Sequence, residues 1–280
     1  MKFSVYTLSL PDLAPEQGAA LIARHGYQGV EWRLSDDPDA FIGEPFSFNR
    51  NNACTVGMTP ADGHQLAQID DRFGLRCVGV APYIRVGDVA NFERAAVVAQ
   101  AAGAPAVRVR APEVDGRAFT ELFQFARGFL QAIAEVARRY EIAVALEIHQ
   151  RTLCSSASLA TRLVDGFDPR VIRVIYDVGN LVVEGYEDHR IGLDLLDEHI
   201  SHIHLKNAWW ERDAHRAGAW VSRWSPLDDG VLNAREFLEL LGARGYAGWV
   251  SLEDLSTDRA PADTLAHNAE LLRTWGFLDA

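Results

Sequence analysis

Cysteine is scarce in this 280-residue chain, in which only Cys54, Cys77 and Cys154 occur. Their odd number and wide spacing leave no readable disulfide framework and no Cys-x-x-Cys metal knuckle. The N-terminus runs directly into an apolar alternation and carries no signal-peptide cleavage pattern. We therefore expect three small buried thiols in a reduced, cytoplasmic protein.

Long hydrophobic runs are also lacking, and basic residues are outnumbered. No apolar run in the sequence approaches the roughly 18 residues that cross a membrane. The chain has 27 Lys and Arg against 39 Asp and Glu, which gives a formal net charge of −12. Because nucleic-acid binding depends on clustered Lys and Arg, the composition predicts a protein with no nucleic-acid partner and no membrane partner.

Several well-known motifs are missing too. The sequence has no Gly-x-Gly-x-x-Gly after a predicted strand and no Gly-x-x-x-x-Gly-Lys-Ser/Thr loop, so it offers no recognisable cradle for a nucleotide cofactor. It has no Gly-x-Ser-x-Gly elbow and no His-Glu-x-x-His helix. These absences disfavour serine hydrolase and zinc-protease chemistry.

What the chain does contain is a regular alternation of eight predicted strands with eight predicted helices. Such alternation implies parallel pairing with helical crossovers, and at this length it favours a closed (β/α)8 TIM barrel, a single α/β domain over residues 1–280. Two long irregular loops are expected, at Ser35–Thr59 and Ala208–Asp229. The predicted strands are Phe3–Leu8, Gly29–Trp32, Arg76–Val80, Ala106–Arg110, Ala143–His149, Val171–Asp177, Ser201–Asn207 and Trp249–Glu253, and the predicted helices are Pro11–His25, Pro60–Phe73, Asn91–Ala102, Arg117–Tyr140, Ser155–Asp165, Asp188–Glu198, Asn233–Ala243 and Pro261–Trp275.

The predicted strand Ser201–Asn207 has an unusual face. Its alternation places His202, His204 and Lys206 on one side and apolar residues on the other. Two imidazoles and an ammonium are costly to bury without partners. This face is therefore suited to a metal or to an anionic or hydroxylated ligand.

Three other late strands also end in groups able to bind a metal. They supply Glu147, Asp177 and Glu253, which join His204 where the strands of a barrel converge. Three buried carboxylates would repel one another without a counter-charge, and a divalent cation removes that cost. Oxygen-rich ligation with one nitrogen suits Mn²⁺, Mg²⁺ or Co²⁺ and, less well, Zn²⁺.

Four short strings resemble the sugar phosphate isomerase/epimerase superfamily, also called xylose-isomerase-like TIM barrels. The resemblance covers essentially the whole chain and implies that Glu147, Asp177, His204 and Glu253 are the metal ligands. It also implies that His149 and Lys206 contact the substrate. The strings are Glu147-Ile148-His149, Asp177-Val178-Gly179-Asn180, His204-Leu205-Lys206-Asn207 and Ser251-Leu252-Glu253.

The chain departs from that family at two positions. Asn180 stands where several members carry a second histidine, and Asn207 stands where an aspartate usually follows the lysine. Both departures argue against a ketohexose epimerase.

The resulting hypothesis is a divalent-metal-dependent isomerase or epimerase that acts on a ketose, polyol or related small sugar. Glu147 and Glu253 would lie on opposite sides of the bound carbon chain, one removing a proton and the other returning it, through an enediolate that the cation stabilises. If a β-hydroxyl leaves instead, the enzyme is a dehydratase, a lyase acting on a keto-inositol or sugar acid. A non-catalytic sugar-binding barrel and an abasic-site endonuclease are more distant alternatives.

Further substrate contacts are expected from residues outside the ligand set. Glu31 ends an early strand, Asn180 follows Asp177, and Arg223 could clamp a carboxylate or phosphate. Arg223 lies in the tryptophan-rich loop, whose aromatic side chains would form a lid or sugar-stacking wall, or a contact between copies in a homo-oligomer. Those side chains are Trp209, Trp210, Trp220 and Trp224.

Overall fold

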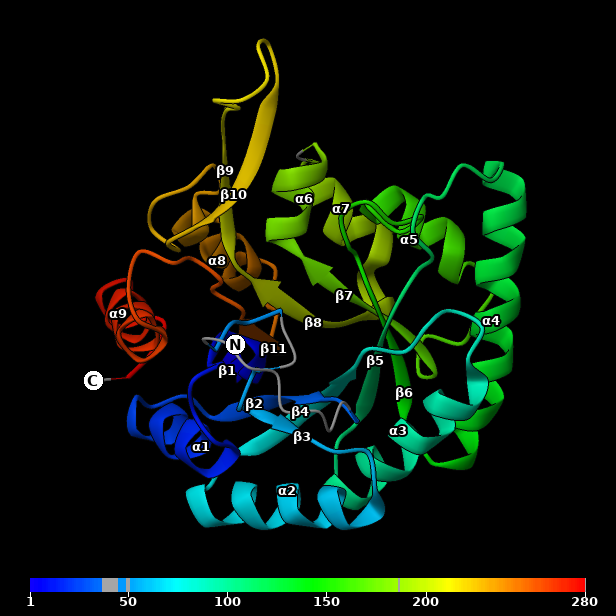
Figure 1. Ribbon diagram of the computed structural model, residues 1–280, viewed down its shortest axis with the longest axis horizontal. Coiled ribbons are helices and arrows are strands. Elements are labelled where there is room, and N and C mark those ends of the chain that lie inside the picture. Colours follow the sequence, from blue (N-terminus) through cyan, green and yellow to red (C-terminus); the bar gives the residue numbers. More distant parts are fainter. Residues whose placement is uncertain (37–44, 49–50, 186, 280) are drawn as a thin grey trace.

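The computed structural model describes residues 1–36, 45–48, 51–185 and 187–279. Eight parallel strands close into a barrel, because β1 pairs with both β2 and β11 while the others follow in sequence order. This arrangement, visible in Figure 1, confirms the predicted (β/α)8 class. The barrel strands are β1 (Lys2–Tyr6), β2 (Gly29–Leu34), β4 (Arg76–Pro82), β5 (Ala106–Arg110), β6 (Ala143–Glu147), β7 (Ile172–Asp177), β8 (Ile200–Leu205) and β11 (Trp249–Leu252).

Helices surround the barrel on the outside (Figure 1). Their ends follow ordinary capping chemistry: Thr59 and Asp62 form a capping box at the start of α2, and Gly74 ends that helix in the left-handed conformation, at φ +65°. No described helix is long and apolar enough to span a membrane. The helices are α1 (Pro15–Arg24), α2 (Pro60–Phe73), α3 (Val89–Ala102), α4 (Phe119–Arg139), α5 (Ala157–Val164), α6 (Val178–Glu184), α7 (His189–Leu196), α8 (Ala234–Ala243) and α9 (Pro261–Thr274), with short 3-10 turns at Thr7–Ser9 and Asp197–His199.

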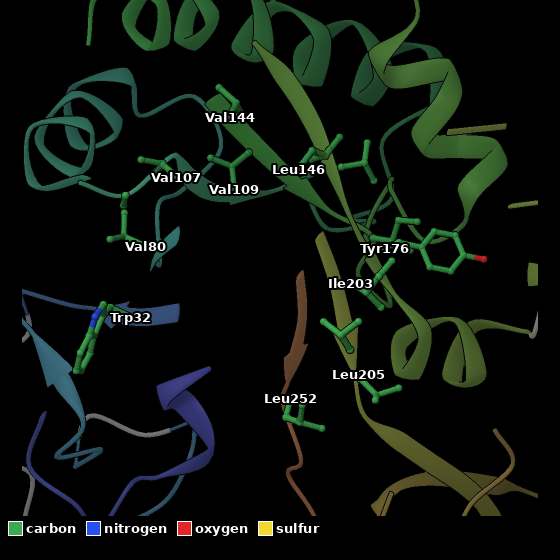
Figure 2. Packing of buried hydrophobic residues seen from close by; sticks show 14 of the residues in the cluster. Trp32, Val80, Val107, Val109, Val144, Leu146, Tyr176, Ile203, Leu205 and Leu252 are labelled. Atoms are coloured by element: carbon green, nitrogen blue, oxygen red, sulfur yellow. The ribbon is translucent and has the colours of Figure 1, made fainter. Parts of the chain in front are cut away.

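Alternation along the strands separates two kinds of side chain. One set packs outward against the helices and forms the main hydrophobic core, which includes Val107, Val144 and Leu205 (Figure 2). The alternate set points into the barrel and includes Arg108 and Glu147, which contact each other there. Polar residues therefore occupy the inside of the barrel at the carboxyl ends of its strands, where TIM-barrel sites are built.

The structure differs from the sequence expectations in two loops. The sequence analysis expected an irregular loop over residues 208–229. The structure instead pairs β9 (Asn207–Arg212) with β10 (Trp220–Ser225) as an antiparallel hairpin. This hairpin, which we call the arm, projects away from the barrel in yellow at the top of Figure 1. In the expected loop 35–59, β3 (Thr55–Val56) adds a short strand beside β2, and residues 37–44 and 49–50 lie outside the described part of the chain.

Helix α6 was also missed by the sequence analysis. It begins directly at the end of β7, where the Asp177 side chain accepts a hydrogen bond from the Asn180 N–H. The residue that ends the strand therefore also caps the helix. Helix α6 has only seven residues, about two turns, and periodicity gives little sign of so short a helix.

Candidate metal centre

The four predicted ligands converge inside the barrel. One ligand atom from each of Glu147, Asp177, His204 and Glu253 lies within 4.8 Å of the others. The side chains are buried, with residue exposures of 0% for the first three and 2% for Glu253. The neighbouring registers Asp177↔His204 and Ser251↔His204 align β7, β8 and β11, which brings together residues far apart in the sequence.

His204 is oriented by a carboxylate on its far side. Its Nε2 lies 2.8 Å from Glu31 Oε2, and because a carboxylate only accepts, this nitrogen carries the proton. Ser251 Oγ donates to the same oxygen at 3.1 Å. The imidazole therefore points its Nδ1 at the ligand cluster, in the manner of a metal-bound histidine steadied by an outer carboxylate. Burial alone would lower the pKa of His204, but Glu31 and the three carboxylates of the cluster outweigh it and raise that pKa well above its usual range, so a metal ion would replace a proton on Nδ1.

The Nδ1 atom of His204 is the strongest sign that a cation belongs here. His204 Nδ1 is buried and has no hydrogen-bond partner, although oxygens of Glu147, Asp177 and Glu253 lie 3.4, 3.6 and 3.3 Å away. Four electron-rich atoms so close together repel unless a proton or a metal ion lies between them. Oxygen donors with one imidazole nitrogen fit a divalent cation.

Two cationic side chains hold the carboxylates from outside the cluster. Arg108 donates from Nε to Glu147 Oε2 at 2.9 Å and also from Nη2 to the same oxygen. Lys206 Nζ donates to Asp177 Oδ2 at 2.6 Å and also to Glu253 Oε2. The centre is thus an alternating array of charges, so that each buried ion has a partner.

These partners set the ionisation of the buried groups. Burial alone would raise the pKa of Glu147, but the Arg108 guanidinium and His204 outweigh it and hold that pKa well below its usual range. Burial likewise opposes ionisation of Glu253, and Lys206 with His204 lowers its pKa. For Lys206, the attraction of Asp177 and Glu253 exceeds the burial effect and raises the pKa. Glu147 and Glu253 are therefore ionised, as metal ligands must be.

The turn after β7 positions Asp177 and Lys206 together. Asn180 donates from Nδ2 to Asp177 Oδ2 at 2.8 Å and to the Ile148 carbonyl at 3.0 Å, so the structure places this predicted substrate contact against a ligand. A Cβ atom at Gly179 would lie 2.3 Å from Lys206 Cγ and 3.0 Å from the Lys206 carbonyl oxygen. Only glycine lets the turn approach the lysine this closely.

His149 lies just beyond the end of β6, where strand structure stops at Glu147. Its Nδ1 lies 2.8 Å from the Gln150 carbonyl oxygen, so Nδ1 carries the proton and Nε2 is left as an acceptor. Burial is the main reason that the pKa of His149 is lowered, and the nearby Arg108 and Lys206 lower it further. The structure therefore presents a neutral imidazole beside Glu147.

Some residues at the centre were not predicted. The Tyr6 ring stacks on the His204 ring, with centroids 5.7 Å apart and planes at 24°, and the buried Tyr6 Oη has no partner among the described residues. Arg108 was missed as well. Its strand, Ala106-Val107-Arg108-Val109-Arg110, carries arginines on one parity between apolar residues, and this pattern could have marked an inward-facing cation.

The arm divides the remaining predicted residues. Trp224, near its base, has its ring centroid 5.0 Å from Lys206 Nζ and packs beside Tyr6 and Leu255. Arg223 has a side-chain exposure of 63% and is paired with Glu211 on the adjacent strand. The Arg223 guanidinium is therefore engaged within the arm, and its role in substrate binding stays a prediction.

Comparison with known proteins places the chain among proteins of the same fold. An inosose dehydratase of Geobacillus thermodenitrificans is 29% identical over 139 residues, which cover 44% of each chain. The chain thus spans less than half the length of this curated relative. The solved structure of the probable 3-DHS dehydratase AsbF from Bacillus anthracis matches with a TM-score of 0.75 and 18% identity, covering 98% of this chain and 99% of that one.

A second solved structure, that of the IOLI protein with a bound zinc atom, matches over the whole of both chains, with a TM-score of 0.73 and 14% identity. At such identities these structures show a shared fold. The family model described as xylose isomerase-like TIM barrel matches residues 19–275, nearly the whole chain. The protein therefore belongs to the xylose isomerase-like TIM barrel family.

Proposed function

We propose that the protein is a divalent-metal-dependent dehydratase that removes water from a polyhydroxy ketone. The observation that carries this choice over isomerisation or epimerisation is the contact between Arg108 and Glu147. Arg108 occupies Glu147 Oε2 with two donors, while Oε1 faces His204 across 3.4 Å. One oxygen of this carboxylate is therefore engaged before any substrate arrives, while the buried Oε1 has no hydrogen-bond partner among the described residues.

This contact matters because epimerisation by two glutamates needs each carboxylate to take up or release a proton in turn. Glu147 is held as an anion by a guanidinium, which suits a ligand and opposes a proton shuttle. Elimination of water needs only one group, which takes the proton from the reacting carbon and returns it to the leaving hydroxyl. The predicted acid–base role of Glu147 is thus the part of the two-glutamate hypothesis that the geometry supports least.

Glu147, Asp177, His204 and Glu253 are the residues that would hold the cation. When bound there, a divalent cation polarises a ketone oxygen and acidifies the adjacent C–H bond. Mn²⁺, Mg²⁺ and Co²⁺ suit the three oxygens and one nitrogen, and the zinc in a structural neighbour keeps Zn²⁺ among the candidates.

The proton transfers fall to the chain's own residues. His149 presents an unprotonated Nε2 and takes the proton from the carbon next to the ketone. The hydroxyl on the following carbon leaves, and the same imidazole returns the proton to it, so that one water is lost and one carbon–carbon double bond forms. Lys206, already a donor to two ligands, stabilises negative charge on the ketone oxygen.

The relatives support this reaction class by name. The curated relative is called an inosose dehydratase and the structural neighbour a probable 3-DHS dehydratase. We therefore take a small polyol-derived ketone as the substrate class. The absence of nucleic-acid and membrane partners, a cytoplasmic location and a homo-oligomer all stay predictions.

Product analysis tests the proposal. Protein loaded with Mn²⁺ is incubated with 2-keto-myo-inositol in D2O and followed by near-ultraviolet absorbance and NMR. We expect a conjugated enol product with the loss of one water, and H149N should lower turnover by about 100-fold, the scale of a single general acid–base group. R235Q, which alters an exposed ion pair on α8, is the control and should turn over normally.

Deuterium entering at a carbon without water loss, accompanied by inversion of that carbon, would instead establish the epimerase. Normal turnover by H149N together with inactivity of E147Q and E253Q would restore the two-glutamate hypothesis.

A further inference from the structure

A second cavity lies beside the metal centre. It has a volume of about 550 Å³, which is within the range of small-molecule sites. Tyr83 and Arg85 follow β4 and line one part of it, and Arg110, the last residue of β5, lines another. Phe125 of α4 contributes an apolar wall. The cavity therefore opens at the carboxyl ends of two barrel strands, on the same face as the metal centre.

One aromatic side chain connects this cavity to the metal centre. The guanidinium carbon of Arg108, which holds Glu147, lies 5.7 Å from the Tyr83 ring centroid, and that of Arg33 lies 5.0 Å from it. On the neighbouring strands, the Cα atoms of Arg110 and Glu147 are register partners. A substrate held at the metal centre could therefore extend past Tyr83 and place a substituent near Arg110.

The charges that line the cavity are unbalanced. The guanidinium groups of Arg85 and Arg110 have no hydrogen-bond or ion-pair partner among the described residues, whereas Arg117 is paired with Asp115 at 2.8 Å. The remaining carboxylate in the lining, Glu113, is exposed. Arg85 is exposed and can be solvated by water, whereas Arg110 is half-buried. In a chain with a net charge of −12, the two guanidinium groups give this cavity a local excess of positive charge.

Arg108, which lies between the cavity and the metal centre, also has an unused donor. Its residue exposure is 5%, two of its nitrogens hold Glu147, and its Nη1 is buried with no partner in the described part of the chain. A buried, unpaired guanidinium N–H is costly, and a charged acceptor removes that cost. Donors from Arg108 and Arg110, two residues apart on the same strand parity, thus bound the path between the two sites.

We propose that the substrate carries an anionic oxygen group, a carboxylate or a phosphate, and that Arg110 and Arg85 bind this group in the cavity. This inference rests on the proposed function, because it takes the bound ligand to be the substrate of that reaction. It narrows the substrate from polyol-derived ketones in general to acidic ones. A neutral keto-inositol would leave both arginines unpaired and would be a weaker substrate than its acidic counterpart.

Binding of three matched polyols tests the proposal without turnover. D-Sorbitol is neutral, D-gluconate has the same carbon number with a carboxylate, and D-sorbitol 6-phosphate carries a phosphate. Dissociation constants are measured by calorimetry at low salt, with Mn²⁺-loaded protein. We expect at least one anionic polyol to bind about tenfold or more tightly than sorbitol, the scale of one charge-assisted contact. The probe that gains affinity distinguishes carboxylate from phosphate.

The variants R110Q and R85Q should each remove most of this preference while leaving sorbitol binding and metal affinity unchanged. R235Q, which lies on α8 and pairs with Glu239, should keep the full preference. Equal binding of all three polyols, or an undiminished preference in R110Q, would refute the inference. Metal loading and water loss are measured separately, so the two proposals can fail independently. A preference for anionic polyols without any dehydration would refute the proposed function alone. Dehydration of neutral ketones that is unaffected by R110Q would refute this inference alone.

Discussion

The two halves of the barrel carry mainly opposite charges at the same end, with Glu31 on β2 and Lys206 after β8 as the exceptions. The later strands β6, β7, β8 and β11 lead to Glu147, Asp177, His204 and Glu253, while the earlier strands β2 and β5 carry Arg33, Arg108 and Arg110, joined by Arg85 just after β4. We propose that the acidic half provides ligands for a cation. The basic half provides a counter-ion for Glu147, and we propose that it also provides donors for the rest of a substrate.

This difference shows how one barrel can bury a charged centre. Arg108 crosses from the basic half to pair with Glu147, and Lys206 pairs with two ligands within the acidic half. Each buried ion is thus compensated even before a metal binds, which lowers the cost of holding four ligands together. The four predictions below separate the contributions of the two halves, in order of expected size.

The largest expected effect comes from breaking the bridge between the halves. R108L leaves Glu147 buried without its cation and should lower the free energy of unfolding of the metal-free protein by about 3–5 kcal/mol. Urea denaturation in EDTA measures this. As a control, R235L removes an exposed ion pair and should cost no more than about 0.5 kcal/mol. Equal stabilities of R108L and the wild type would show that the bridge does not stabilise the fold.

Loss of a ligand in the acidic half should be next. D177N removes one anionic donor, and we expect the metal dissociation constant to rise by at least about 100-fold, because even outer partners of ligands are worth 10–100-fold. Competition with a metal-binding dye measures it. D188N is the matched control, since Asp188 caps α7 as Asp177 caps α6 but lies outside the ligand cluster. A similar loss in both variants would point to helix capping instead.

A smaller effect is expected from the outer partner of His204. E31Q replaces the carboxylate that accepts from His204 Nε2 with a neutral group, and metal affinity should fall by about tenfold. S251A removes only the hydroxyl that also donates to Glu31, so its effect should be under about threefold. Unchanged metal binding in E31Q would show that His204 needs no orienting anion.

The smallest effect concerns a carboxylate outside the centre. Burial raises the pKa of Asp70 to about 7, although the hydrogen bond from Trp32 Nε1 opposes the shift. Since the folded protein holds this proton more tightly than the unfolded chain, the stabilisation is greatest at low pH and is lost as the pH rises through 7. Between pH 6 and 8 the loss should be about 1 kcal/mol. Chemical denaturation across this range should show a flatter profile for D70N, and identical profiles would contradict the assignment.

The sequence by itself predicted the barrel and the four residues that the structure brings together inside it. Eightfold alternation of strands and helices predicted the closed fold, because period-2 and period-3.6 patterns reflect which faces are buried. The four predicted ligands could be found because each lies at or near the carboxyl end of a predicted strand, and strand ends in a parallel barrel must meet. Glu147, Asp177, His204 and Glu253 do lie together, although what they bind stays a prediction.

Only the tertiary structure decided what surrounds those ligands. The contact of Arg108 with Glu147, the stacking of Tyr6 on His204 and the cavity beside Tyr83 depend on barrel closure and side-chain direction, which no local pattern contains. The arm was missed for the opposite reason. Its two short strands pair with each other and not with the barrel. Their tryptophans therefore do not alternate with polar residues as the side chains of a half-buried strand do, and no strand pattern could be detected.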